Sequence, residues 1–68
     1  MDVSFPERLR ELRESRRPRI SRRVLGELCG LSKNQISRYE RGERVPDLNE
    51  AARLADFFEV TIDHLYGR

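Results

Sequence analysis

The sequence predicts an all-α protein of five helices, and three features of the chain lead to that prediction. Apolar residues recur at the three- and four-residue spacings that place side chains on one side of a helix. Ser, Thr or Asp residues stand ahead of these segments as N-caps, and glycines follow several of them as stops. Residues with β-branched side chains never alternate over four positions or more, so no strand is expected.

The first helix is expected to open near Phe5, because Ser4 and Glu7 have the spacing of a capping box. It should end before Pro18, which lacks the amide that a helix interior requires. The arginines around Pro18 make the turn that follows a basic one.

The second helix should be capped by Ser21 and end at Gly30, which allows a left-handed turn. Its apolar side holds Val24, Leu25, Leu28 and Cys29. We interpret Val24 and Leu28 as a cover for the long first turn, with a contact to another protein as the alternative. Cys29 is expected to be a buried, unreactive thiol.

The third helix is expected from about Ser32 to Arg41, with Gly42 closing it. Ser32 and Gln35 have capping-box spacing, and Ile36 and Tyr39 should be the buried pair. Asp47 and Thr61 predict the caps of two further helices, and Glu50 completes the capping box of the first of these. The inward residues of the fourth helix should be Leu48, Ala51, Ala52, Leu54, Ala55 and Phe58, and those of the fifth Ile62 and Leu65.

The length of 68 residues predicts one domain over residues 1–68. A single cysteine excludes an internal disulfide, and the absence of a long apolar run or a signal-peptide pattern predicts a cytoplasmic protein that does not enter a membrane. Residues 8–44 hold twelve Lys or Arg against five Asp or Glu, whereas residues 45–68 hold two against five. The first two thirds of the chain is therefore the expected polyanion-binding part.

The segment between Ser21 and Gly42 has the spacing of two short helices joined by a turn, and Gly26 is small where these helices should cross. The run GELCGLSKNQISRYERG, and above all its end ISRYERG, resembles the XRE family of helix-turn-helix regulators, of the lambda-repressor and Cro type. The resemblance extends to the closing VTIDHLYG and so covers nearly the whole chain. It implies a five-helix, lambda-repressor-like DNA-binding domain.

The function implied by this resemblance is sequence-specific binding of double-stranded DNA by a small transcriptional regulator, such as a phage-type repressor, a controller protein or an antitoxin. The third helix would lie in the major groove, where Lys and Arg can donate to guanine and Asn can pair with adenine. The expected base-reading residues are Lys33, Asn34, Ser37 and Arg38. Phosphate contacts are expected from Arg22, Arg23, Ser32 and Arg44. Gln35 should face sideways.

The chain departs from the family pattern in its longer first turn and at two residues. Arg22 stands where the family commonly has Gln, and a phosphate contact survives that change. Glu59 stands where Gly or Asn is common, so its backbone is expected to be strained. The resemblance also implies a structural ion pair between Arg13 and Glu40.

A homodimer on a palindromic operator is expected, because one reading helix covers only a few base pairs. In the family, the last helix and the loop before it contact a second copy. The corresponding residues here are Phe57, Thr61, Ile62, His64 and Tyr66.

Two other classes of function agree less well with the sequence than DNA binding does. A helix-turn-helix adaptor that binds another protein should have an apolar third helix, and the polar residues at that face argue against it. A small hydrolase or nuclease would need converging carboxylates, whereas those of the last two helices are scattered. We therefore expect no enzymatic activity, no cofactor, no metal and no small-molecule substrate, and His64 is interpreted as an exposed helical residue.

Overall fold

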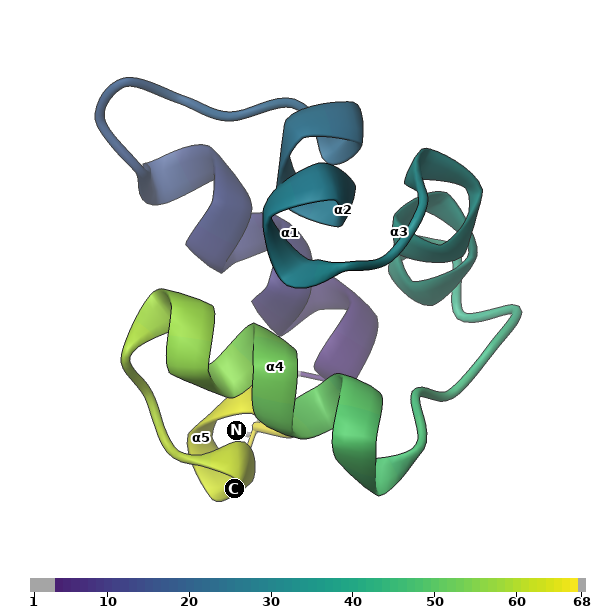
Figure 1. Cartoon of the computed structure of the whole chain (residues 1–68). Helices are drawn as coiled ribbons and strands as arrows, with labels where there is room; N and C mark the ends of the chain where they lie inside the picture. The colour runs from purple at the N-terminus through teal and green to yellow at the C-terminus, as the bar shows by residue number, and fades with distance from the viewer. Residues whose placement is uncertain (1–3, 68) are drawn as a thin grey trace.

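The computed structural model describes residues 4–67, which form five α-helices and, within that range, no strand (Figure 1). The helices are α1 (Phe5–Ser15), α2 (Arg22–Cys29), α3 (Lys33–Glu40), α4 (Leu48–Phe58) and α5 (Ile62–Leu65). This confirms the all-α class, and each helix begins within one residue of its predicted start.

Four of the five predicted caps form. The side chains of the N-cap residues accept a hydrogen bond from the backbone amide three residues later, at 2.8–3.1 Å, in Ser21, Ser32, Asp47 and Thr61. These bonds satisfy amides that the first turn of a helix leaves without partners. The four starts therefore follow from contacts between residues three positions apart.

The capping box predicted at Ser4 is wrong, although α1 does begin at Phe5. The Ser4 hydroxyl caps no amide and instead donates to Oε1 of Glu7 at 3.3 Å. Pro6 in the first turn removes one of the amides that the Ser4 oxygen could otherwise accept a hydrogen bond from.

Side chains of all five helices form the core, and α3 packs against both α2 and α1. In Figure 1, α4 lies below α1 and nearer the viewer, while α2 and α3 lie above α4. The largest fully buried side chains come from all five helices and are Leu9, Leu25, Ile36, Tyr39, Leu54 and Leu65. The rings of Phe5 and Tyr66 lie 5.1 Å apart, so the two ends of the described chain are joined.

Three residues expected on inward faces are exposed. Val24 and Leu28 on α2 are 38% and 61% exposed, and Leu48, the first residue of α4, is 75% exposed. The prediction that Val24 and Leu28 cover the first turn is therefore wrong. The inner side of the eight-residue α2 is already occupied by Leu25 and Cys29, both buried as its apolar pattern predicts.

Arginine contacts hold the first turn in place instead. The guanidinium group of Arg16 lies 4.5 Å from the centre of the Phe57 ring on α4, a cation–π geometry. Arg13 donates from Nη1 to the carbonyl oxygen of Ile20 at 3.1 Å, which ties the end of the turn back to α1.

Glu59 ends α4 in the left-handed region, with φ 58° and ψ 43°. This confirms the backbone expected there from the family's preference for Gly or Asn. A side chain with a Cβ costs roughly 1–2 kcal/mol in that conformation, so Glu59 is a site of local strain.

Candidate nucleic-acid interface

The crossing of α2 and α3 depends on Gly26. A Cβ added at this position would lie 2.8 Å from the carbonyl carbon of Ser32 and 3.1 Å from the nitrogen of Lys33. Side-chain carbons do not approach backbone that closely, so a larger residue would push the two helices apart. Gly30 makes the left-handed turn between them, with φ 72°. The predicted helix-turn-helix geometry is confirmed.

The inner side of α3 is fixed to the rest of the protein. Ile36 and Tyr39 are fully buried, as the spacing predicts. Gln35 also faces sideways as predicted, because its Oε1 accepts from the amide of Ser32 at 3.0 Å and its Nε2 donates to Glu50 at 3.1 Å. These contacts leave α3 little freedom to rotate about its axis.

The opposite side of α3 is polar and open. Lys33, Asn34 and Arg38 are exposed, and Ser37 is half-buried between them and the body of the protein. The four residues come from one helix and occupy neighbouring positions on successive turns. Side chains that can donate to base edges therefore lie together, as a reading surface requires.

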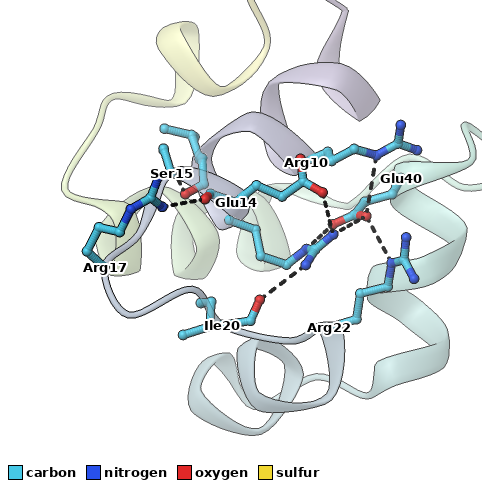
Figure 2. Close-up of polar contacts among 9 residues, drawn as sticks. Arg10, Glu14, Ser15, Arg17, Ile20, Arg22 and Glu40 are labelled. Carbon is cyan, nitrogen blue, oxygen red and sulfur yellow. Dashed lines mark hydrogen bonds and ion pairs between the residues drawn. The ribbon is translucent and has the colours of Figure 1, made fainter.

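The carboxylate of Glu40, the last residue of α3, is surrounded by three arginines (Figure 2). Arg13 binds both of its oxygens, from Nε at 2.7 Å and from Nη2 at 3.1 Å. Arg22 donates from Nε to Oε1 at 3.0 Å, and the Nε atom of Arg10 lies 3.8 Å from the same oxygen. The predicted pair of Arg13 and Glu40 is confirmed, but as part of a larger cluster.

Glu40 stays ionised although it is buried. Burial alone would raise the pKa of its carboxyl group, but the hydrogen bonds and positive charges of Arg13 and Arg22 outweigh burial and lower that pKa below its usual value. A charge this far from water is stable only because it is paired and hydrogen-bonded.

A second carboxylate, that of Glu50 on α4, organises the other end of α3. It accepts from the amide of Asp47 at 3.0 Å as well as from Gln35, and the Nη2 atom of Arg44 lies 3.5 Å away. Burial and the nearby charge of Glu50 raise the pKa of Tyr39 to about 12, so this tyrosine is neutral at physiological pH.

The residues predicted to contact phosphate lie around α3, each with an intramolecular partner. Arg22 is held by Glu40 and Arg44 by Glu50, and both side chains remain more than 40% exposed. Arg23 forms an exposed pair with Glu27 at 3.3 Å. Both the amide and the hydroxyl of Ser32 are engaged with Gln35. The phosphate contacts themselves stay predictions.

The helix-turn-helix arrangement of the chain also occurs in known proteins. A family profile described as a helix-turn-helix domain matches residues 5–65, which is most of the chain. The chain belongs to the helix-turn-helix family. The resemblance stated from the sequence is thereby confirmed.

Two transcriptional regulators of Bacillus subtilis (strain 168) resemble this helix-turn-helix protein in sequence. It is 40% identical over 62 residues to the HTH-type transcriptional regulator AnsR, covering 91% of this chain and 52% of AnsR. It is 29% identical over 66 residues to the HTH-type transcriptional regulator ImmR, covering 97% of this chain and 50% of ImmR. The chain spans about half the length of these two relatives.

Solved structures share the fold of this helix-turn-helix protein. The P22 c2 repressor in complex with a synthetic operator has a TM-score of 0.84 at 28% identity, with 93% of this chain and 92% of that chain covered. The restriction-modification controller protein C.AhdI from Aeromonas hydrophila has a TM-score of 0.79 at 32% identity, with 91% and 87% covered. These matches confirm the lambda-repressor-like fold and support the expected class of function, a DNA-binding regulator of transcription.

Two aromatic residues predicted to contact a second copy already have partners within the chain. The ring of Phe57 lies under the guanidinium of Arg16 and is half-buried. The hydroxyl of Tyr66 donates to the carbonyl oxygen of Pro46 at 3.4 Å, and its ring is half-buried against Phe5. Part of each side chain is therefore used to close the protein's own core.

The other three candidates for that contact lie together on and beside α5. Ile62 is half-buried, and Thr61 and His64 are exposed. The exposure of His64 agrees with the sequence interpretation, and the predicted contact with a second copy remains a prediction.

Sequence reasoning missed the place of Arg10 beside Glu40 and the role of Glu50 in holding Gln35. Arg10 and Arg13 are three residues apart and so share one side of α1, which was an available signal. Spacing alone could not show which acidic residue that side would meet, because Glu40 lies 27 positions after Arg13, and the family resemblance implied a partner for Arg13 only.

Within residues 4–67, no group of three or more His, Cys, Asp or Glu side chains is arranged to hold a metal ion. In the same range, none of the helices has the length and apolar character needed to cross a membrane.

Proposed function

We propose that this protein binds double-stranded DNA sequence-specifically with α3 in the major groove and represses transcription by occupying an operator. The observation that carries the proposal is the contrast between the two sides of α3. Ile36 and Tyr39 are fully buried, while Lys33, Asn34 and Arg38 on the other side are exposed. A rigid helix with one polar side is what reading of base edges requires.

The flanking arginines support the same proposal. Phosphate contacts fix the position of a protein on DNA without reading its sequence. Arg22 and Arg44 lie on α2 and in the loop after α3, each held by a glutamate yet more than 40% exposed. The function proposed is binding rather than catalysis, with DNA as the ligand.

We further propose that the operator is palindromic and is bound by two copies of the chain. A single reading helix spans a few base pairs, and a two-fold pair places its helices roughly 34 Å apart, one turn of DNA. The residues at and around α5 are the proposed contact. A nuclease footprint at saturating protein should cover two half-sites, and a footprint of one half-site would contradict this proposal.

The test of sequence reading begins with a pool of random duplexes, from which those retained by the protein are sequenced. Wild-type protein and Asn34→Ala are then titrated against the selected duplex and single-base variants of it. Asn34→Ala should lose about 1–3 kcal/mol of discrimination at one base pair, because the side-chain amide no longer pairs with a base. Its slope of log K against log salt should stay that of the wild type.

Asn49→Ala is the matched control, since Asn49 is an exposed asparagine on α4 rather than α3. It should keep the full base preference. If Asn34→Ala, Ser37→Ala and Arg38→Ala all retained that preference, α3 would not be the reader, and an adaptor that binds another protein would be the better proposal.

A further inference from the structure

The Glu40 cluster contains more positive charge than its carboxylate needs. Arg13, whose side chain is 8% exposed, engages both carboxylate oxygens, an arrangement that satisfies the charge and the geometry of the carboxylate. Arg22 and Arg10 add two further guanidinium groups at the same place. Even with Glu14, which lies 3.9 Å from Arg13, the cluster keeps an excess of positive charge.

The two additional arginines differ from Arg13 in their exposure. The side chains of Arg10 and Arg22 are 49% and 43% exposed, whereas that of Glu40 is 1% exposed. Both approach Oε1 of Glu40 through Nε, so their terminal nitrogens extend beyond the carboxylate. Figure 2 shows the Arg10 guanidinium group above the Glu40 carboxylate and the Arg22 guanidinium group below it, with the terminal nitrogens of both pointing away from the carboxylate.

We propose that Arg10 on α1 binds a phosphate of the DNA backbone, next to the phosphate held by Arg22. This proposal rests on the proposed function, and it adds α1 to a surface that the sequence assigned to α2, α3 and the following loop. Two half-exposed guanidinium groups that share one carboxylate oxygen lie close enough to bind neighbouring phosphates of one strand. The chemistry is that of a charge-assisted, planar donor and an anionic oxygen.

A purely structural role explains Arg10 less well. An ion pair at 3.8 Å with one partner half-exposed contributes little to stability. Glu40 is also already paired twice at 3.0 Å or less without Arg10. The side chain is therefore available for a ligand outside the chain, and its loss should be felt in binding rather than in folding.

The test compares Arg10→Gln with the matched control Arg8→Gln. Both replace an arginine of α1 and remove one positive charge, but the two positions lie about 200° apart around the helix. Arg8 pairs with Glu11 at 2.9 Å and not with Glu40. Each variant is titrated against a scrambled duplex at several salt concentrations, after its melting temperature has been compared with that of the wild type.

Arg10→Gln should melt as the wild type does, and the magnitude of its slope of log K against log salt should fall by about 0.9, the value for one phosphate contact. Arg8→Gln should keep the wild-type slope, and Arg10→Lys should restore most of the loss. In the double variant Arg10→Gln, Arg22→Gln the magnitude of this slope should fall by about 1.8, because contacts to two separate phosphates are lost.

An unchanged slope in Arg10→Gln would overturn the proposal, and so would an equal decrease in Arg8→Gln, which would show a general effect of charge. The proposed function fails separately, through equal affinity of the wild type for selected and scrambled duplexes. The salt slopes are measured on the scrambled duplex, so they still test the Arg10 contact if the protein shows no sequence preference.

Discussion

The two ends of α3 are attached to the protein by two glutamates that use different partners. Glu40 at the end of the helix is 1% exposed and is bound by arginine side chains alone. Glu50, which meets the first turn, is 12% exposed and accepts from a backbone amide and from the neutral side chain of Gln35, with Arg44 further away. One attachment depends on paired charge, and the other on a hydrogen bond from the neutral side chain of Gln35.

The difference matters because charges and neutral groups respond differently to the loss of a partner. A buried charge left unpaired keeps its full cost of desolvation, whereas a neutral group near the surface can be rehydrated. The Glu40 end should therefore fail abruptly when one residue is changed, and the Glu50 end should weaken gradually. Three measurements test this contrast.

The largest effect is expected from Arg13→Ala. It leaves the buried carboxylate of Glu40 without its two-point partner and should lower the free energy of unfolding by about 3–5 kcal/mol. The control is Arg23→Ala, which breaks the exposed pair with Glu27 and should cost less than about 1 kcal/mol. Urea unfolding followed by circular dichroism measures both. Equal losses in the two variants would show that burial of Glu40 adds nothing.

Acid should produce a smaller loss at the same place, because protonation removes the charge of Glu40 but leaves its side chain in position. The pKa of Glu40 is lowered in the folded protein by Arg13 and Arg22 against the opposing effect of burial. Its contribution to stability is therefore complete above the unfolded pKa, about 4.3, and is lost as the pH falls through the lower, folded value.

Melting temperatures measured between about pH 7 and about pH 3 should show this loss in the wild type. Glu40→Gln should be less stable at neutral pH, and its melting temperature should depend less steeply on pH in the acid range. An acid dependence identical to that of the wild type would assign the loss to other carboxyl groups.

The smallest effect is expected from Gln35→Ala at the other end of α3. The variant loses the bond to the Ser32 amide and the bond to Glu50, while the Ser32 cap to the helix remains. Half of a capping box and one partly exposed hydrogen bond are removed, so the free energy of unfolding should fall by about 1 kcal/mol. Thermal unfolding measures it, and a loss as large as that of Arg13→Ala would remove the contrast between the two ends.

Local contacts explain why most of the fold was predictable. The caps at Ser21, Ser32, Asp47 and Thr61 each join residues three positions apart, so they are present in the sequence as they are in the structure. Ser4 is the exception, because Pro6 lacks one of the amides that its hydroxyl could cap, and the hydroxyl only donates to Glu7.

Exposure on α2 was predicted less well. The apolar spacing identified one side of the helix, and it correctly placed Leu25 and Cys29 in the core. It could not show that α2 meets the start of α3 at Gly26. With that contact at Gly26, the side chains of Val24 and Leu28 remain exposed. How much of an apolar side is buried depends on where and at what angle the neighbouring helices cross it.

The sequence by itself determined the helices, the turn at Gly30 and the polar residues of α3, because each depends on neighbours within one or two helical turns. The family resemblance implied the pair of Arg13 and Glu40, but only the tertiary structure decided that Arg10 and Arg22 join it, since the three pairs span 18 to 30 positions and form after the helices pack. Charge has a long range and little dependence on direction, so a basic sequence is compatible with many pairings. Packing selects one of them, and in doing so it leaves Arg10 and Arg22 half-exposed beside the helix proposed to read DNA.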